Sequence, residues 1–116
     1  MHPNTRACIA YVAARLISGH GSSSVFDYSQ SRHISIGGSV DQSNVSVYDY
    51  DRRCHFSGSP SSLYDYGRQA HVSLSINGNQ FSGYDYGDSH HFTGSVDGNA
   101  VSMYDYGESK HFSYSV

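Results

Sequence analysis

Three residue types capable of acid–base or metal chemistry recur in this chain at constant spacing. An aromatic–Asp–Tyr triplet is followed, after four residues, by His and an apolar residue, and this happens five times between Phe26 and Phe112. Carboxylate, phenol and imidazole groups are the usual carriers of general acid–base catalysis and of metal ligation. A residue needed once for chemistry has no reason to appear five times, however. The repetition therefore favours a structural unit over an active site.

The five Asp residues of the triplets could act as acids or cation ligands. They could instead accept hydrogen bonds from the backbone N–H groups of the polar turn that follows each of them, which is a common role for Asp. Their repetition favours this turn-capping role. The residues concerned are Asp27, Asp49, Asp65, Asp85 and Asp105.

The five repeated His residues raise the possibility of a metal site. In a flat sheet, equivalent strands lie two apart, so these imidazoles would be separated by about 9–10 Å. Metal–nitrogen bonds are about 2.0–2.1 Å long, so only radial packing or a second subunit could gather them around one ion. No metal or cofactor is therefore expected, and His90-His91 is the first place to look for one. A simpler role is cross-strand pairing with tyrosine, as predicted for Tyr28 and His33.

Tyrosine, histidine and serine together predict an amphipathic, hydrogen-bonding surface. Such residues suit protein interfaces and can also stack on sugars. The predicted interaction face consists of Tyr48, Tyr50, Tyr64, Tyr66, Tyr84, Tyr86, Tyr104, Tyr106, His33, His55, His71, His91 and His111.

The elements expected to position these residues are β-hairpins. Asn77-Gly78 and Asp97-Gly98 are strong two-residue turn signals, with positive φ expected at both central positions. The four polar residues after each triplet form a second turn at the opposite end. The chain is thus predicted to be mainly β, an antiparallel meander of about ten short strands in five repeats. It could stay open or close into a barrel or radial ring, and a β-solenoid is the alternative.

Side-chain alternation supports this hairpin assignment. In the copy from 91 to 106, Val96, Val101 and Asp105 fall on one face, whereas His91 and Tyr104 fall on the other. Burial of the aliphatic face alone would contribute too little free energy to offset the conformational entropy that the chain loses on folding, which costs about 1.5 kcal/mol per residue. The tyrosines are therefore expected to be partly buried as well, in a barrel, a ring or a dimer.

Two copies of the repeat differ in length from the others. The second copy lacks four residues and is expected to turn near Ser59-Pro60. The first copy has two extra residues, which predict a bulge or a wider loop at Gly37-Gly38.

Residues 1–21 differ from the repeats that occupy 22–116, and both parts are expected to form a single domain over 1–116. Pro3 and Asn4-Thr5 make a plausible helix start and Gly19 a plausible end. The apolar residues between them would occupy most of a helix's circumference, so such a helix should lie buried against the repeats. The alternative pairs Tyr11–Ser18 as a strand with Ser22–Tyr28.

Composition narrows the classes of partner and compartment. A net charge of −3 and a pI near 6.2 argue against nucleic-acid binding, and no stretch is long enough to span a bilayer, so no membrane partner is expected. Cys8 and Cys54 fit neither a disulfide framework nor a zinc pattern, which favours reduced thiols in a cytoplasmic protein. Export is less favoured, because Arg15 interrupts the apolar run from Ala7 to Ile17.

The cadence Tyr-Asp-Tyr-Gly…Asp-Gly-Asn, at intervals of about twenty residues, resembles the tyrosine–aspartate repeats of Rhs-type shell proteins. It is also similar to small bacterial β-flower proteins, in which hairpins are arranged radially. The resemblance covers Val25 to Val116, although the repeated His is not part of the tyrosine–aspartate pattern. It implies a structural β-repeat and brings no catalytic residues with it.

The sequence contains no nucleophile–base pair, phosphate-binding loop or cofactor fingerprint, so an enzyme is not expected. The favoured function is a structural or protein-interaction module that self-associates through the Tyr/His/Ser face as a homo-oligomer. The alternative is a glycan- or metal-binding protein that uses the same face.

Overall fold

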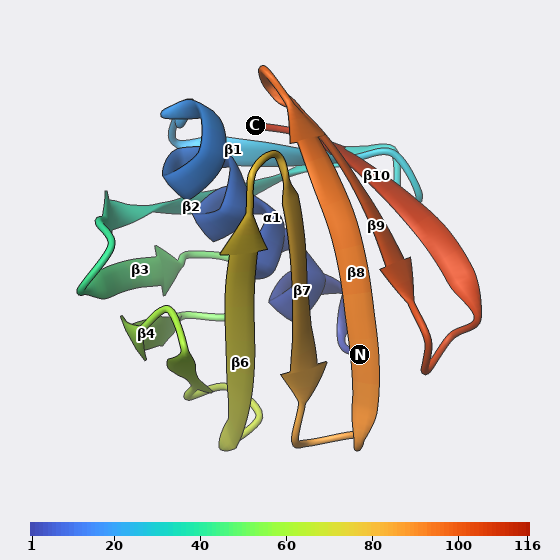
Figure 1. The fold of residues 1–116 in the computed structure, drawn as a ribbon. Helices are drawn as coiled ribbons and strands as arrows, with labels where there is room; N and C mark the ends of the chain where they lie inside the picture. Colours follow the sequence, from blue (N-terminus) through green and yellow to red (C-terminus); the bar gives the residue numbers. More distant parts are fainter.

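The protein is a closed ten-stranded antiparallel β-barrel with one helix inside it, in a computed structural model that describes all 116 residues (Figure 1). Each strand pairs with the next along the chain, and β1 pairs with β10 to close the barrel. The predicted meander and the N-terminal helix are confirmed, whereas the solenoid, the open sheet and the strand assigned to Tyr11–Ser18 are wrong. The elements are α1 (Pro3–Ser18), β1 (Ser24–Asp27), β2 (Arg32–Val40), β3 (Val45–Asp49), β4 (Cys54–Ser59), β5 (Ser62–Asp65), β6 (Ala70–Asn77), β7 (Gln80–Asp85), β8 (His90–Asp97), β9 (Ala100–Asp105) and β10 (Lys110–Ser115).

The tight turns that join β6 to β7 and β8 to β9 are shifted by one residue from their predicted positions. Asn77 and Asp97 already pair within the strands, so the central pairs are Gly78-Asn79 and Gly98-Asn99. Only the glycines have positive φ, 64° and 61°, which is the pattern of a type II′ turn. The expectation of positive φ at both central positions is therefore wrong.

The unequal copies are accommodated in two ways. β4 and β5 are joined at Pro60-Ser61, next to the predicted turn. The two extra residues of the first copy lie in the loop 41–44 between β2 and β3, so their predicted place at Gly37-Gly38 is wrong. Gly38 is instead a strand residue at φ 140°, and a side chain there would collide with the carbonyl oxygen of Ser46.

Helix α1 supplies the centre of the hydrophobic core. Every residue from Asn4 to Ala14 is buried, so the helix contacts inward-facing strand residues on all sides, as its apolar circumference predicts. The small side chains of Ala7, Ala10 and Ala13 allow the helix to fit within the barrel. α1 is too short to cross a lipid bilayer.

Because the helix fills the barrel, the tyrosines are not needed in the core. The second Tyr of each triplet is 52–60% exposed, so its expected burial is wrong. The first aromatic residue of each triplet is half-buried, by its neighbours on the outer face. The exposed residues are Tyr28, Tyr50, Tyr66, Tyr86 and Tyr106.

Two inward-facing glycines make room for phenylalanine rings inside the barrel. A Cβ at Gly83 would collide with the ring of Phe92 and with the carbonyl oxygen of Ser73. Gly94 stands in the same relation to Phe81, and the two phenyl rings lie 6.4 Å apart between their centroids. Because these two positions have no side chain, the backbone of β7 and β8 can lie directly against the rings of Phe92 and Phe81.

Replacing Gly83 by Ala is expected to destabilise the barrel by about 1–3 kcal/mol, the usual cost of overpacking, because neither the ring nor the backbone oxygen has space to move. Urea unfolding followed by circular dichroism measures the change. Gly37→Ala is the matched control, since a Cβ there would meet only a ring carbon of Tyr50 at 3.6 Å. Equal midpoints for the two variants would contradict the close packing described for β7.

Candidate functional site

Each triplet Asp points into one end of the barrel and is at most 1% exposed. In every copy, Oδ1 accepts a hydrogen bond of 2.8–3.0 Å from the backbone N–H group two residues later. The fourth residue after each triplet Asp adopts a left-handed φ between 51° and 60°, although none is glycine. Each carboxylate therefore caps a turn whose backbone needs such support.

Arginine side chains connect neighbouring carboxylates around this end of the barrel. Arg52 Nε donates to Asp49 Oδ2 at 2.6 Å, and Arg52 Nη1 lies 3.1 Å from Asp65 Oδ2. Arg68 continues the series to Asp85, with which it forms a close ion pair. Burial disfavours the charge on Arg52, but the hydrogen bond to Asp49 and the charge of Asp65 outweigh it and raise the pKa of that guanidinium.

The helix supplies the remaining partners of the carboxylates. Arg6 Nη1 lies 3.3 Å from Asp105 Oδ2, and Arg6 Nε donates to the Tyr114 hydroxyl at 3.2 Å. Thr5 Oγ1 donates to Asp65, and Asn4 Nδ2 donates to Asp49 at 3.1 Å. The positive end of the α1 dipole also faces this end of the barrel. The buried carboxylates are thus neutralised by the turn residues Arg52 and Arg68 and, from inside the barrel, by Arg6.

These arginines were not predicted, although the sequence carries a signal for two of them. Arg52 and Arg68 both stand three residues after the triplet Asp of their copies. At the same position, copies four and five have the acids Asp88 and Glu108. In copy five the cation near the carboxylate comes from the start of the chain, where Arg6 and the α-amino group contact Asp105, and no repeat pattern could indicate that.

His2 caps the start of α1. Its Nδ1 accepts the backbone N–H of Asn4 at 3.0 Å, which requires that nitrogen to be unprotonated. Partial burial, reinforced by the charge of Arg52, lowers the pKa of His2 below its usual value of 6.5. The neutral imidazole is therefore the form that the folded state favours.

Acidification is expected to weaken this cap. Because the folded pKa of His2 is depressed, its contribution to stability is complete above about pH 6.5 and is lost as the pH falls below that value. His2→Ser keeps a capping oxygen at every pH, so its free energy of unfolding should fall less between about pH 7.5 and pH 5.5 than that of the wild type. Urea titrations at both pH values measure this, with His20→Ser as the control. An identical fall in wild type and His2→Ser would rule out the cap as a source of pH dependence.

The outer face of each hairpin carries a compact aromatic cluster. In the second copy, Tyr48 pairs with His55 across β3 and β4, and Tyr50 packs edge-on against Tyr48. Ring centroids in all five clusters lie 4.6–4.9 Å apart, in the edge-to-face arrangement that aromatic rings favour. His33 correspondingly pairs with Phe26, so the predicted partner Tyr28 is wrong.

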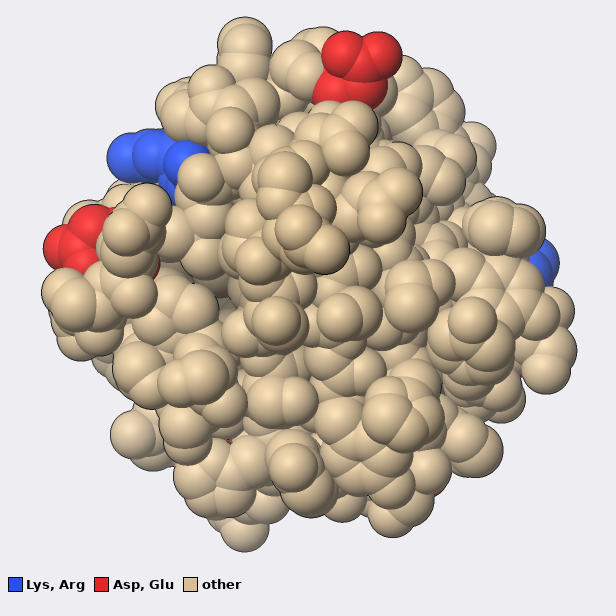
Figure 2. All heavy atoms as spheres, in the orientation of Figure 1, with Lys and Arg blue, Asp and Glu red and all other residues tan.

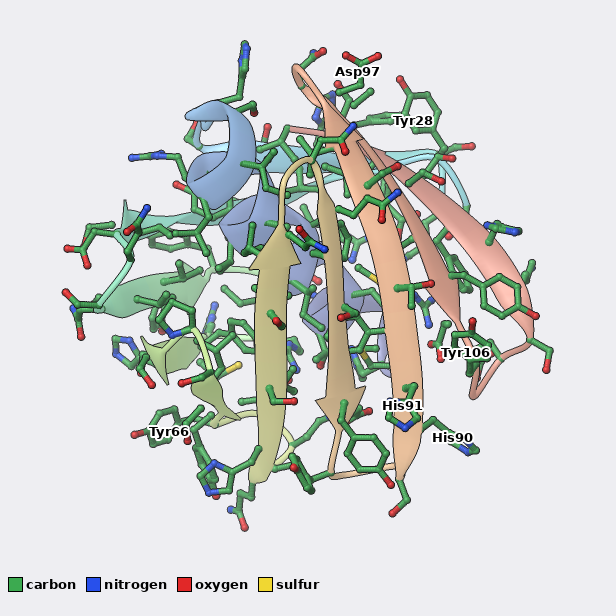
Figure 3. All side chains as sticks on the ribbon, viewed as in Figure 1. Tyr28, Tyr66, His90, His91, Asp97 and Tyr106 are labelled. Carbon is green, nitrogen blue, oxygen red and sulfur yellow. The ribbon has the colours of Figure 1, made fainter.

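We call these five clusters the aromatic belt, because they follow one another around the outside of the barrel. Figure 3 shows its members Tyr28, Tyr66 and Tyr106 on different sides of the molecule. Two neighbouring clusters also touch, with 6.4 Å between the ring centroids of His55 and Tyr66. The belt consists of Phe26, Tyr28, His33, Tyr48, Tyr50, His55, Tyr64, Tyr66, His71, Tyr84, Tyr86, His91, Tyr104, Tyr106 and His111.

The imidazoles of the belt do not converge. Each belongs to its own hairpin, and no group of three or more His, Cys, Asp or Glu side chains is placed to hold a metal ion. His90 and His91 are adjacent residues of β8, so their side chains leave opposite faces of the strand (Figure 3). Cys8 and Cys54 are free, and burial raises the pKa of the Cys8 thiol well above its usual value.

The strand residues that face outward carry almost no charge. They are nearly all Ser, Thr, Tyr and His, and Asp97 at the tip of β8 is the single charged one. The other Asp, Glu, Lys and Arg residues lie in the turns and strand ends at the two ends of the barrel, or inside it. Figure 2 shows the resulting uncharged expanse on the face formed by β6, β7 and β8.

The outer wall is also hollowed over β6–β9. A depression of about 390 Å³ is lined by residues such as Ser75, Ser82, Thr93 and Tyr104. A second depression, of about 600 Å³, shares the first three of these residues and extends toward His91 and the belt. We call the two together the wall hollow. Sequence reasoning placed tyrosine, histidine and serine together on this face but did not predict that the short serine side chains would leave a hollow between the larger ones.

No family model, curated protein or solved structure matches the chain, so inferences about its function start from the belt, the wall and the hollow.

Proposed function

We propose that this protein is a structural or protein-interaction module that self-associates through its aromatic belt. The observation that carries the proposal is the exposure of the second tyrosine of every triplet, at 52–60%, on a wall almost free of charge. Tyrosine offers a large, rigid contact area that loses little conformational entropy when it binds. Serine beside it supplies adaptable hydrogen bonds, and the absence of charge removes the cost of desolvating ions.

The shape of the belt supports assembly with several neighbours. Because the clusters are distributed around the barrel, a second copy can meet one from more than one direction. A single compact patch would favour a closed dimer, whereas a surface presented on several sides favours an extended or multi-subunit assembly. The barrel beneath is rigid and filled by α1, so the rings need little rearrangement to bind.

The proposed role is not catalytic, and strand geometry supplies the reason. Within each repeat, the Asp side chain faces the interior and is buried, while the His side chain faces outward and is exposed. The acid and the imidazole therefore lie on opposite sides of the barrel wall. A catalytic pair needs its two groups within hydrogen-bond reach of each other.

Light scattering coupled to size-exclusion chromatography tests the proposal over a range of protein concentrations. We expect assemblies larger than one chain whose mass grows with concentration. In Tyr66→Lys/Tyr106→Lys, two belt positions become charged and repel their counterparts, so the mass should fall toward that of one chain.

The matched control is Gln42→Lys/Asn79→Lys, which adds the same charge at two exposed loop positions, between β2 and β3 and between β6 and β7, that take no part in the belt. This control should assemble like the wild type. A wild-type protein that stays a monomer at every concentration would refute the proposal, and equal dissociation of both double variants would place the interface away from the belt.

A further inference from the structure

The wall hollow exists because of the order of side-chain sizes along the outer face of β6–β9. Large rings stand at the end that carries the belt, and the amides Asn77 and Gln80 stand at the other end. Between them, the outward positions are short hydroxyl side chains, so the surface is lower there. At about 390 Å³ and 600 Å³, the two parts of the hollow fall within the range of about 300–1,000 Å³ that small-molecule sites occupy.

The floor of the hollow is a grid of unused hydroxyl groups. Ser75 pairs with Ser82 across β6 and β7, Ser82 pairs with Thr93, and Ser95 pairs with Ser102. Cross-strand neighbours of this kind are about 4.5–5.5 Å apart. Their side chains make no hydrogen bond within the protein, whereas the nearby Ser73 hydroxyl accepts one from the backbone N–H of Tyr84. Each free hydroxyl can both donate and accept.

The edge of the hollow is aromatic. Tyr104 and His111 border one part, and Tyr84, His91 and Tyr106 border the other. Figure 3 shows His91 and Tyr106 toward the same end of the barrel, with Asp97 at the far end of β8. The rings are held edge-to-face against one another, with 4.6 Å between the centroids of Tyr104 and His111. Their phenol groups add further hydrogen-bonding positions.

These features define the chemistry of a ligand. It must offer many hydroxyl groups to the floor, present an apolar C–H face to the rings, and carry no net charge, because no charged side chain lines either part of the hollow. A phosphate, a carboxylate or a cation would find no counter-charge there. A lipid chain would leave the hydroxyl floor without partners.

We infer that the wall hollow over β6–β9 binds a neutral oligosaccharide. Its ring hydroxyls exchange hydrogen bonds with Ser75, Ser82 and Thr93, and its C–H face lies against Tyr104 or Tyr106. The site is shallow and open, so binding is weak for a single sugar chain and gains strength where several copies of the protein engage one polymer. This inference goes beyond the proposed self-association and does not depend on it.

Titration with uncharged trisaccharides, monitored by the backbone amide signals of isotope-labelled protein in NMR spectra, tests the inference. The probes are cellotriose, maltotriose, mannotriose and N,N′,N″-triacetylchitotriose. We expect at least one of them to shift signals from β6–β9 in a saturable way. Thr93→Phe fills the middle of the hollow and should abolish the shifts, whereas Ser57→Phe, which faces outward from β4, should preserve them.

The repeats supply a second matched pair. Tyr104→Ala and Tyr48→Ala remove the first tyrosine of copies five and two, but only the former borders the hollow. Affinity should fall roughly tenfold in Tyr104→Ala and stay unchanged in Tyr48→Ala. No saturable shift with any of the four sugars, or shifts that survive Thr93→Phe, would overturn the inference. Light scattering on the same samples reports self-association separately, so failure of one proposal is distinguishable from failure of the other.

Discussion

The Ile9→Asp variant is expected not to fold into the barrel. Ile9 lies in the middle of α1 and is fully buried among the inward side chains of the strands. A carboxylate there would have no cation beside it, and burial of an unpaired charge costs many kcal/mol. Since the whole free energy of unfolding of a domain is about 5–15 kcal/mol, this substitution should remove the folded state. Circular dichroism and the dispersion of amide signals in NMR spectra measure the loss.

A graded series separates the effect of the charge from that of packing. Ile9→Val should lower the free energy of unfolding in urea by about 0.5–1.5 kcal/mol and Ile9→Ala by about 2–5 kcal/mol, because the cavity grows as more of the side chain is removed. Ser113→Asp introduces the same carboxylate on the exposed outer face of β10 and should stay within about 0.5 kcal/mol of the wild type. Cooperative unfolding of Ile9→Asp at the wild-type midpoint would show that the helix is dispensable for the barrel.

The Arg68→Met variant is expected to lose about 3 kcal/mol of stability, in the range found when one member of a buried ion pair is removed. Arg68 contacts Asp85 directly and also lies near Asp65, and both carboxylates are buried. Methionine keeps most of the side-chain volume, but it leaves Asp85 without its cation and Asp65 with Arg52 alone. Urea unfolding at neutral pH measures the difference.

Two further variants make this result interpretable. Arg32→Met removes an exposed arginine, whose partner Asp51 is also exposed, and should cost at most about 1 kcal/mol. Asp85→Asn combined with Arg68→Met removes both charges while keeping an oxygen that can cap the turn, so part of the lost stability should return. If Arg32→Met lowered the free energy of unfolding as much as Arg68→Met, burial would not explain the contribution of the ion pair between Arg68 and Asp85.

Local features of the fold could be predicted from the sequence because each depends on a few neighbouring residues. The alternation of Val96, Val101 and Asp105 against His91 and Tyr104 assigns the strand faces correctly, since register is determined by the period of the pleat. The exact central residues of the tight turns were missed, because Asp-Gly-Asn contains two overlapping turn signals. Only the strand pairing decides between them.

Closure of the sheet and the contents of the barrel could not be predicted in the same way. A flat sheet, a ring and a barrel share the same alternation, and they differ only in whether β1 meets β10. The second tyrosine of each triplet stays largely exposed because α1 already fills the space it would have occupied, whereas the first aromatic residue is half-buried, as expected. Arg6 and Asp105 are 99 positions apart in the chain, so no spacing rule could pair them.

Only part of the candidate binding surface could be predicted from the sequence. The tyrosines and histidines were identified because they repeat at constant spacing. The hollow depends on the contrast between small and large residues on four neighbouring strands, and this contrast becomes a surface feature only when those strands lie side by side. The sequence thus predicts which residue types share this face but not that the short ones form a hollow on it.

The placement of α1 inside a closed barrel constrains how the chain can reach this structure. The seam between β1 and β10 is short, with the pairs Phe26–Ser115 and Asp27–Tyr114, and it joins segments separated by most of the chain. The strands enclose α1 on all sides, and this enclosure is complete only once β1 pairs with β10. Contacts between such distant segments form slowly. The helix near the start of the chain is therefore fully enclosed only after β10, the last strand, has paired with β1. Both ends of the chain are needed to complete the barrel.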